Sequence, residues 1–364
     1  SIPAKKYGIQ TGEPVSMALQ KCPNLICVPG DFRLYDRCSR AFKSICASYA
    51  PVMESFSIDE VFLDMSGTDL IYPDPYGLAV HIKDQIHREL GFTVNIGIST
   101  NKLLAKMASD FEKPDKVHTL YPSEIESKMW PLPVRDLLFL GKASEKKLLQ
   151  NGIRTIGELA HADENEIRLL LGEKTGHLLY QYANGIDDSP VKAEKDESKG
   201  ISVETTFDED IISYEQIFPI LLSQCDIVAA RMRREGKKCN CVAVSFRTLD
   251  FINKSHQCRL NNPTDVTDEI YQKVKILFQE SWKGQPLRLI GVALTGLTED
   301  EYIQFSLFED VSRRERQKKL DETLDNIRRK YGNDKVTRAS TMNVSDRIGR
   351  KARDMFLSIH SSEQ

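Results

Sequence analysis

The sequence predicts a multidomain protein of the α/β (α+β) class, in which short strands alternate with amphipathic helices. Three observations lead to this prediction. The chain has 364 residues, which is more than one ordinary hydrophobic core accommodates. Strand-like and helix-like patterns alternate before residue 121 and again after residue 199. The composition changes near Tyr121, across the charged stretch 191–198 and after Leu297, and these changes mark the expected domain boundaries.

The strand and helix patterns can be placed along the chain. Before residue 121, alternating apolar residues predict strands at 52–56, 61–65 and 92–98, with helices at 78–90 and 101–111. Proline and glycine then interrupt a series of short helical segments, which predicts a helical domain.

After the charged stretch the patterns change again. Strands are expected at 242–246 and 289–294, and helices at 213–235 and 265–282, which together indicate a small second α/β domain. Beyond Leu297 the chain becomes polar, and its pattern is helical.

Composition limits the classes of function. With 40% hydrophobic and 28% charged residues, the chain reads as a soluble, cytoplasmic protein. No apolar run approaches the roughly 18 residues that would span a bilayer, and no signal peptide is visible. The eight cysteines lack the paired spacing of a metal site and are expected to be reduced, although a weak site on Cys239 and Cys241 stays open.

The charge is unevenly distributed. The net charge is -3, yet residues 311–364 carry 14 Lys plus Arg against 8 Asp plus Glu. A basic tail on an acidic body is compatible with contact to nucleic acid, and equally with a plain solvated helix.

The stretch SFSIDEVFLDMS, residues 55–66, places Asp59 beside Glu60 in an otherwise apolar run. Neighbouring side chains of a strand point to opposite faces, so these carboxylates meet only where the chain bends. Two carboxylates held close together repel each other unless a cation lies between them, and hard oxygen ligands select Mg²⁺ or Mn²⁺. The alternative is a turn whose acidic side chains are solvated.

This stretch is followed by NIGISTNKLLAKMASD at 95–110 and by Lys113-Pro114. In this order the segments resemble the palm of the Y-family translesion DNA polymerases, in particular of the bacterial DNA polymerase IV branch. NGID at 184–187 and SVETTF at 202–207 continue the resemblance along nearly the whole chain.

The resemblance implies a right-handed polymerase. The implied parts are partial small fingers (1–30), a palm (31–121), a thumb with a helix-hairpin-helix (122–190), a linker (191–198), a little finger (199–298) and a clamp-binding motif with a basic helical tail (299–364). It also implies a monomer that binds primer-template DNA and deoxynucleoside triphosphates.

The resemblance assigns roles to individual residues of the palm. Asp59 and Glu60 would be two of three catalytic carboxylates that bind two Mg²⁺ ions, with Mn²⁺ as a possible substitute. Lys113 would contact the incoming triphosphate, and Lys5 stands where the family has a triphosphate-binding arginine. Lys106 is expected to point elsewhere along its helix, in a structural or DNA-facing position.

The start of the chain departs from the family pattern. The family's first catalytic aspartate and its aromatic steric gate precede the segment that matches the first residues here, and Ile2 stands where a tyrosine is usual. We therefore expect the polypeptide as written to have little or no polymerase activity.

DNA contacts are expected in both of the later domains. Residues 138–157 resemble a helix-hairpin-helix, whose turn offers backbone N–H groups to phosphate, and 172–176 is a weaker second candidate. In the little finger, basic and acidic residues nearly balance, so contact with DNA depends on where the basic side chains lie. The candidates are Gly141, Lys142 and Arg154 in the thumb, and Arg231, Arg233, Arg234, Lys237, Lys238, Arg247 and Arg259 in the little finger.

The stretch QFSLF provides a possible partner site. Gln304, Leu307 and Phe308 have the spacing of the motif that binds the bacterial sliding clamp, and a short peptide can bury such anchors in an apolar groove. The alternative is that these side chains pack against this protein's own domain.

Two other functions are compatible with part of the sequence. Nucleotidyl cyclases share the palm and its paired acidic residues, but they need neither the thumb nor a separate little finger. A DNA-binding and clamp-binding protein without catalysis is the non-enzymatic alternative.

Overall fold

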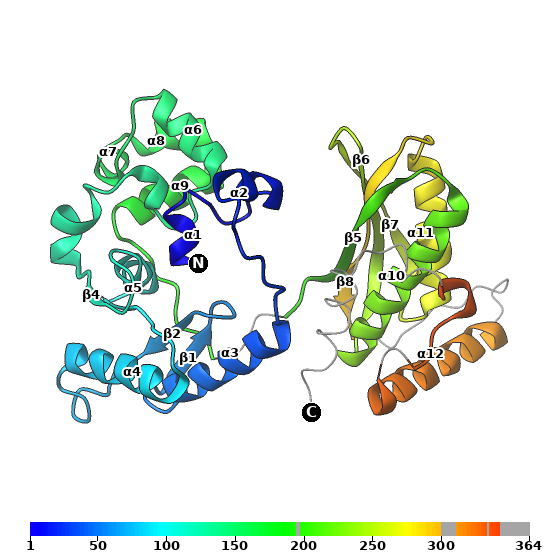
Figure 1. The fold of residues 1–364 in the computed structure, drawn as a ribbon, viewed down its shortest axis with the longest axis horizontal. Coiled ribbons are helices and arrows are strands. Elements are labelled where there is room, and N and C mark those ends of the chain that lie inside the picture. The colour runs from blue at the N-terminus through cyan, green and yellow to red at the C-terminus, as the bar shows by residue number, and fades with distance from the viewer. Residues whose placement is uncertain (194–196, 300–310, 333–334, 343–364) are drawn as a thin grey trace.

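The computed structural model describes residues 1–193, 197–299, 311–332 and 335–342. Figure 1 shows a mixed helical and stranded N-terminal half and a C-terminal half built on one sheet. The multidomain α/β (α+β) class expected from the sequence is confirmed by this arrangement of elements.

The first half begins with two short helices, α1 (Ile2–Lys5) and α2 (Val15–Lys21). Helix α3 (Phe32–Ala47) then leads to an antiparallel pair of strands, β1 (Val52–Ser55) and β2 (Val61–Asp64), and α4 (Pro75–Leu90) follows. The two long helices pack on the hairpin through Phe42, Cys46, Ile82 and Ile86, which are buried together. The predicted hairpin and the predicted helix at 78–90 are confirmed.

A second strand pair lies beside the helix that connects its two strands. Strand β3 (Ile96–Ile98) is parallel to β4 (Val117–Thr119), and α5 (Lys102–Ser109) connects them. The strand packs so closely on α5 that a Cβ atom on Gly97 would lie 1.9 Å from the carbonyl oxygen of Ala105. Only glycine fits there, which explains the glycine in the middle of this strand.

The helical region is built from short elements, as predicted. Three single turns, Pro122–Glu124, Ile125–Met129 and Val134–Asp136, precede four helices. Thr155 caps one of these helices together with Glu158, in a capping box that satisfies two backbone N–H groups. The four helices are α6 (Lys142–Gln150), α7 (Ile156–Ala160), α8 (Glu164–Leu171) and α9 (Glu173–Ala183).

The C-terminal half is a four-stranded antiparallel sheet in the order β5-β8-β6-β7. The strands are β5 (Gly200–Ile211), β6 (Lys238–Thr248), β7 (Asn253–Thr264) and β8 (Leu287–Thr298). Helices α10 (Tyr214–Arg234) and α11 (Thr267–Ser281) bury one face of the sheet in a single apolar core (Figure 1). The sequence predicted two of the four strands.

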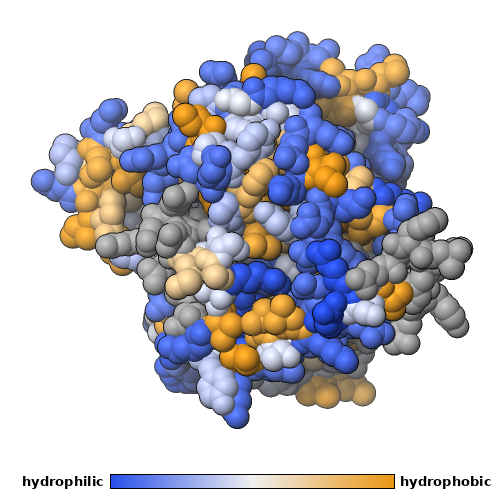
Figure 2. Space-filling view, turned by 90° about the vertical axis from the view of Figure 1, so that its right-hand side faces the viewer, coloured by the Kyte–Doolittle hydropathy of each residue, from blue (hydrophilic) through white to orange (hydrophobic). Residues whose placement is uncertain are grey.

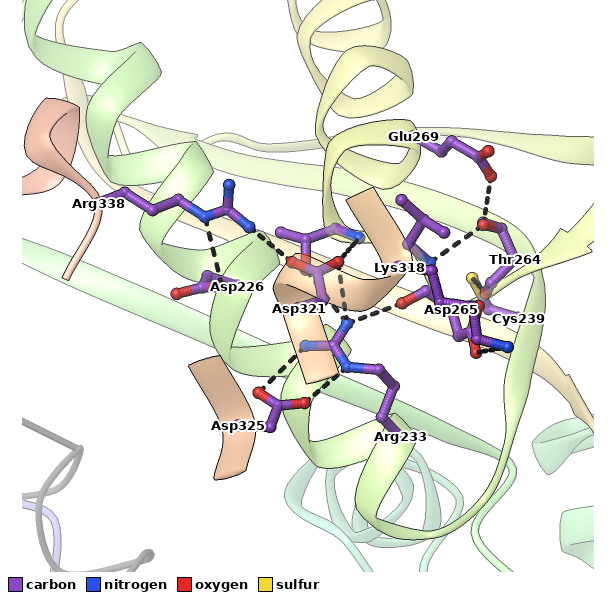
Figure 3. A network of polar contacts seen from close by, with 12 residues as sticks. Asp226, Arg233, Cys239, Thr264, Asp265, Glu269, Lys318, Asp321, Asp325 and Arg338 are labelled. Atoms are coloured by element: carbon purple, nitrogen blue, oxygen red, sulfur yellow. Dashed lines mark hydrogen bonds and ion pairs between the residues drawn. The ribbon is translucent and has the colours of Figure 1, made fainter. Parts of the chain in front are cut away.

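Helix α12 (Val311–Tyr331) packs against α11, and the residue buried in it is a carboxylate, Asp321. Asp321 Oδ2 accepts a hydrogen bond of 2.8 Å from the backbone N–H of Thr267, the first residue of α11. Its Oδ1 accepts one of 2.7 Å from Arg338 (Figure 3). Asp321 therefore serves as the N-terminal cap of a helix that has no side-chain cap of its own.

Further ion pairs hold α12 in place. Arg328 contacts Asp226 of α10 at 2.6 Å, and Arg314 contacts Glu269 of α11 at 2.8 Å. Figure 2, which views this end of the molecule, shows a surface on which hydrophilic residues predominate and apolar residues are scattered. The ion pairs show that the helix docks mainly through charge. Of the predicted helical tail, the structure describes a helix at Val311–Tyr331, which packs on the sheet domain.

Candidate active site

The two adjacent acidic residues lie at the tip of the β1-β2 hairpin. Backbone N–H groups of Phe56 and Ser57 donate to the carbonyl oxygen of Glu60 and close the bend. Ser57 Oγ lies 2.7 Å from Asp59 Oδ1 and 3.2 Å from Glu60 Oε2, so both carboxylates face one hydroxyl group. Lys43 of α3 braces the tip by donating to the carbonyl oxygen of Ser57 at 2.6 Å. The predicted bend thus brings the two carboxylates together.

Lys106 of α5 reaches this tip, which corrects the expectation that it points elsewhere. Its Nζ lies 2.8 Å from Glu60 Oε1 and 2.6 Å from Asp110 Oδ2. The opposite face of α5 carries Leu103, Leu104, Met107 and Ala108, which are buried. This burial fixes the rotation of the helix and turns Lys106 towards the hairpin, a contact that the sequence pattern of α5 alone could not show.

Asp110 is the second acidic partner in this group and had no predicted role. Its Oδ1 lies 2.7 Å from the Nζ of Lys113, whose side chain is largely exposed. Burial alone would raise the pKa of Asp110, but hydrogen bonds from Lys106 and Lys113 outweigh it and lower this pKa. Burial likewise opposes the charge of Lys106, and Asp110 and Glu60 reverse the effect and raise its pKa. The charged forms of Asp110 and Lys106 are therefore both stabilised by this contact.

An open cleft of about 1800 Å³ joins the site residues predicted for the fingers and palm. Lys5, Asp59, Glu60, Lys106 and Lys113 all line it. Residues far apart in the sequence thus line one space. Its charged residues are six acidic ones (Asp59, Glu60, Asp64, Asp69, Asp187 and Asp188) and four lysines (Lys5, Lys102, Lys106 and Lys113). Such a space suits a polyanion that is bound together with a cation.

The hairpin tip has the chemistry of part of a divalent-cation site. Asp59 and Glu60 supply hard carboxylate oxygens, which Mg²⁺ and Mn²⁺ prefer, and two carboxylates are a usual protein contribution to Mg²⁺ bound with phosphate. Within the described ranges, no cluster of three or more His, Cys, Asp or Glu side chains could hold a metal ion. Asp59 and Glu60 are therefore candidates for two ligands of a cation and do not form a complete metal site by themselves.

The N-terminal end of α5 connects the hairpin to the helical region. Glu54 of β1 pairs with Lys102 at 2.9 Å and accepts a hydrogen bond from the backbone N–H of Lys192 at 2.8 Å. Asp187 accepts a hydrogen bond of 3.2 Å from the N–H of Leu103, in the first turn of α5. One helix thus contacts the candidate site through Lys106 and the end of the helical region through its first turn.

The predicted phosphate contacts of the helical region are exposed. Gly141 is the N-cap of α6, and it has no side-chain cap and open space around the position of a Cβ atom. Lys142 and Arg154 are exposed on the same region. The weaker candidate at 172–176 has another explanation, because a Cβ atom on Gly176 would lie 2.5 Å from the Cα of Arg168. Gly176 permits close packing of α8 and α9.

The basic candidates of the sheet domain separate into two groups. The side chain of Arg233 is 8% exposed and pairs with Asp325 at 2.7 Å, and the buried Lys237 pairs with Glu197 at 3.1 Å. We exclude these two from the DNA contacts, because Arg233 is already paired with a carboxylate of α12 and Lys237 with Glu197. The remaining candidates are partly or fully exposed, namely Arg231, Arg234, Lys238, Arg247 and Arg259.

Three further expectations concern the QFSLF stretch, the cysteines and the absence of a membrane span. Gln304, Leu307 and Phe308 lie outside the described residues. Burial raises the pKa of the Cys239 thiol to about 12, so it stays protonated and is a poor metal ligand. Among the helices that the structure describes, none is long and apolar enough to cross a membrane.

Comparison with known proteins gives consistent matches along the chain. Residues 1–110 match the impB/mucB/samB family, residues 198–307 match the C-terminal domain of that family, and residues 135–187 match the thumb domain of DNA polymerase-iota.

Relatives match over most of their length. A DNA polymerase IV of Clostridium acetobutylicum is 44% identical over 339 residues, covering 93% of this chain and 85% of the relative. A DNA polymerase IV of Acetivibrio thermocellus is 36% identical, covering 90% and 83%. A chimeric Y-family DNA polymerase has a similar fold, with a TM-score of 0.72 at 23% identity, covering 82% of this chain and 87% of the other.

Proposed function

The chain belongs to the bacterial DNA polymerase IV branch of the Y-family polymerases, and we propose that it extends a DNA primer along a template, including across damaged bases. The observation that supports this most is the meeting of Asp59 and Glu60 in a cleft that Lys5 and Lys113 also line. Carboxylates for cations and lysines for a triphosphate are what nucleotidyl transfer needs at one place.

Each of these residues has a proposed role. Asp59 and Glu60 would hold Mg²⁺, or Mn²⁺ in its place, as two of the ligands. When bound, two such ions would lower the pKa of the primer 3′-hydroxyl and neutralise charge on the triphosphate and the departing pyrophosphate. Lys113 and Lys5 would neutralise the remaining triphosphate charge, each as a point charge rather than as a bidentate fork.

The other regions would position the DNA. We assign the fingers to 1–30, the palm to 31–121, the thumb to 122–190 and the little finger to 199–298. In the thumb, Gly141, Lys142 and Arg154 would contact backbone phosphates. In the little finger, the exposed Arg234 and Arg259 and the partly exposed Arg231 and Arg247 would do the same. A polymerase must accept any template, so contacts of this kind carry no sequence preference.

We further propose that Gln304, Leu307 and Phe308 bind the bacterial sliding clamp. A tether of this kind would raise the effective concentration of the polymerase at the primer terminus. The spacing of the three residues is the support for this partner.

Primer extension by the full-length protein tests the proposed function. We expect incorporation of deoxynucleotides that depends on a primer, a template and a divalent cation, and continued synthesis opposite a damaged template base. Synthesis that needs no template, or formation of a cyclic nucleotide from a triphosphate, would overturn the proposal.

A further inference from the structure

Four charged side chains form a continuous series from the hairpin tip to the largely exposed Lys113. Glu60 contacts Lys106 at 2.8 Å, Lys106 contacts Asp110 at 2.6 Å, and Asp110 contacts Lys113 at 2.7 Å. The two oxygens of Asp110 are divided between the lysines, since Oδ2 takes Lys106 and Oδ1 takes Lys113. Lys106 is likewise shared, between Glu60 and Asp110.

We propose that Lys106 and Asp110 are positioning residues that couple triphosphate binding at Lys113 to cation binding at Asp59 and Glu60. This inference rests on the proposed function, because it takes those two sites as its end points. Neither Lys106 nor Asp110 needs to touch the cation or the triphosphate. Their role is to set how much of the negative charge of Glu60 is available to bind a cation.

The series provides a physical route for this coupling. While Asp110 holds both lysines, Lys106 is divided between two carboxylates and compensates part of the charge of Glu60. A triphosphate that takes Lys113 leaves Asp110 with Lys106 alone, so the attraction of Lys106 to Asp110 increases. Lys106 then shifts away from Glu60, whose Oε1 becomes free to bind a cation.

Burial restricts Lys106 to these two partners. Its side chain is 14% exposed, whereas that of Lys113 is 59% exposed. A buried ammonium group is costly without a carboxylate partner, so it stays with Glu60 or Asp110 instead of moving into solvent. Lys113 can leave Asp110 for a phosphate at little cost, because it lies near solvent and such exposed pairs contribute little.

Titration of the full-length protein with Mn²⁺ in the absence of DNA and nucleotide tests the proposal directly. Lys106→Met removes the competing charge and should tighten Mn²⁺ binding about fivefold to tenfold. Lys113→Ala should also tighten it, since Asp110 then draws Lys106 from Glu60. Asp110→Asn should weaken it, since Lys106 then remains on Glu60.

A double-mutant cycle distinguishes coupling through Lys106 from a direct electrostatic effect of Asp110 and Lys113 on the bound cation. In the Lys106→Met background, Asp110→Asn and Lys113→Ala should change the Mn²⁺ affinity by less than about twofold, because the link between them and Glu60 is gone. Lys116→Ala is the matched control, because Lys116 is an exposed lysine of the same loop that pairs with Glu112 instead. It should leave the affinity unchanged.

The outcomes distinguish this inference from the function on which it rests. If Asp59→Asn binds Mn²⁺ as tightly as the wild type, the metal site itself is wrong. If Asp59→Asn loses binding but the Asp110 and Lys113 effects persist unchanged in Lys106→Met, the coupling is overturned and the site stands. Thermal unfolding of each variant identifies any that fails to fold. Lys106→Arg retains the positive charge, so, unlike Lys106→Met, it should bind Mn²⁺ with the affinity of the wild type.

Discussion

Arg233 donates hydrogen bonds through Nε and Nη2 to both carboxylate oxygens of Asp325, at 2.7 and 3.2 Å, across 92 residues of sequence. The same guanidinium donates to the carbonyl oxygen of Asp265 at 2.7 Å. It therefore joins the end of α10, the start of α11 and helix α12 (Figure 3). An arginine with these partners stabilises the domain and is not available to a phosphate.

Removal of Asp321 should destabilise the little finger. Asp321→Ala leaves the buried Arg233, Arg338 and the N–H of Thr267 without this carboxylate, and breaking such a buried pair costs about 3–5 kcal/mol. The neighbouring Glu322 is exposed, so Glu322→Ala should change stability by less than about 0.5 kcal/mol. Urea unfolding of both variants measures the difference. Equal stabilities would show that α12 contributes little to the fold.

Arg247 and Arg233 should differ in their effects on DNA binding. Each phosphate contact that is lost reduces the slope of log affinity against log salt by about 0.9 on duplex DNA. Arg247→Ala should show this reduction, whereas Arg233→Ala should lower the stability of the protein and leave the salt slope unchanged. Titration of a fluorescent primer-template at several salt concentrations makes the comparison. The opposite assignment of the two effects would contradict the separation of these arginines.

Lys113 should act on the nucleotide more than on the DNA. Lys113→Ala should weaken incoming-nucleotide binding about tenfold or more, since it removes a charge-assisted contact to the triphosphate. Affinity for primer-template should change little. Single-turnover incorporation at varied nucleotide concentration gives the nucleotide affinity, with Lys116→Ala as the control. An equal loss for DNA and nucleotide would indicate damage to the palm instead.

Leu307 and Phe308 should be needed for binding to the sliding clamp but not for basal primer extension. Changing both to Ala removes the apolar anchors of the proposed motif and should abolish binding to the sliding clamp and stimulation by it. Basal primer extension without the clamp should match that of the wild type. A direct titration in which the double variant binds the clamp with unchanged affinity would contradict this partner.

The sequence predicted local elements well where their patterns are long. The periodicity of 101–111 gave α5 and its buried face, and the acidic pair was placed correctly at a bend. Strand β4 has three residues, which is too short for alternation to appear, and β7 is too polar to read as a strand.

Side-chain partners were the part that the sequence could not provide. The four-residue spacing of Lys106 and Asp110 is compatible with an ion pair at the end of a helix, but the contact of Lys106 with Glu60 depends on how α5 packs beside the hairpin. Arg233 and Arg247 are both arginines in a domain of nearly balanced charge. Only the docking of α12 shows that one of them is buried.

The most direct test of the account is primer extension by the full-length protein carrying Asp59→Asn. This change keeps the size of the side chain and removes the charge proposed to bind the cation. We expect the extension rate to fall by about a thousandfold or more, since the loss of a ligand of the catalytic metal ions costs several kcal/mol of barrier, while primer-template affinity stays nearly intact. A rate within about tenfold of the wild type would contradict the assignment of Asp59 to the catalytic metal site.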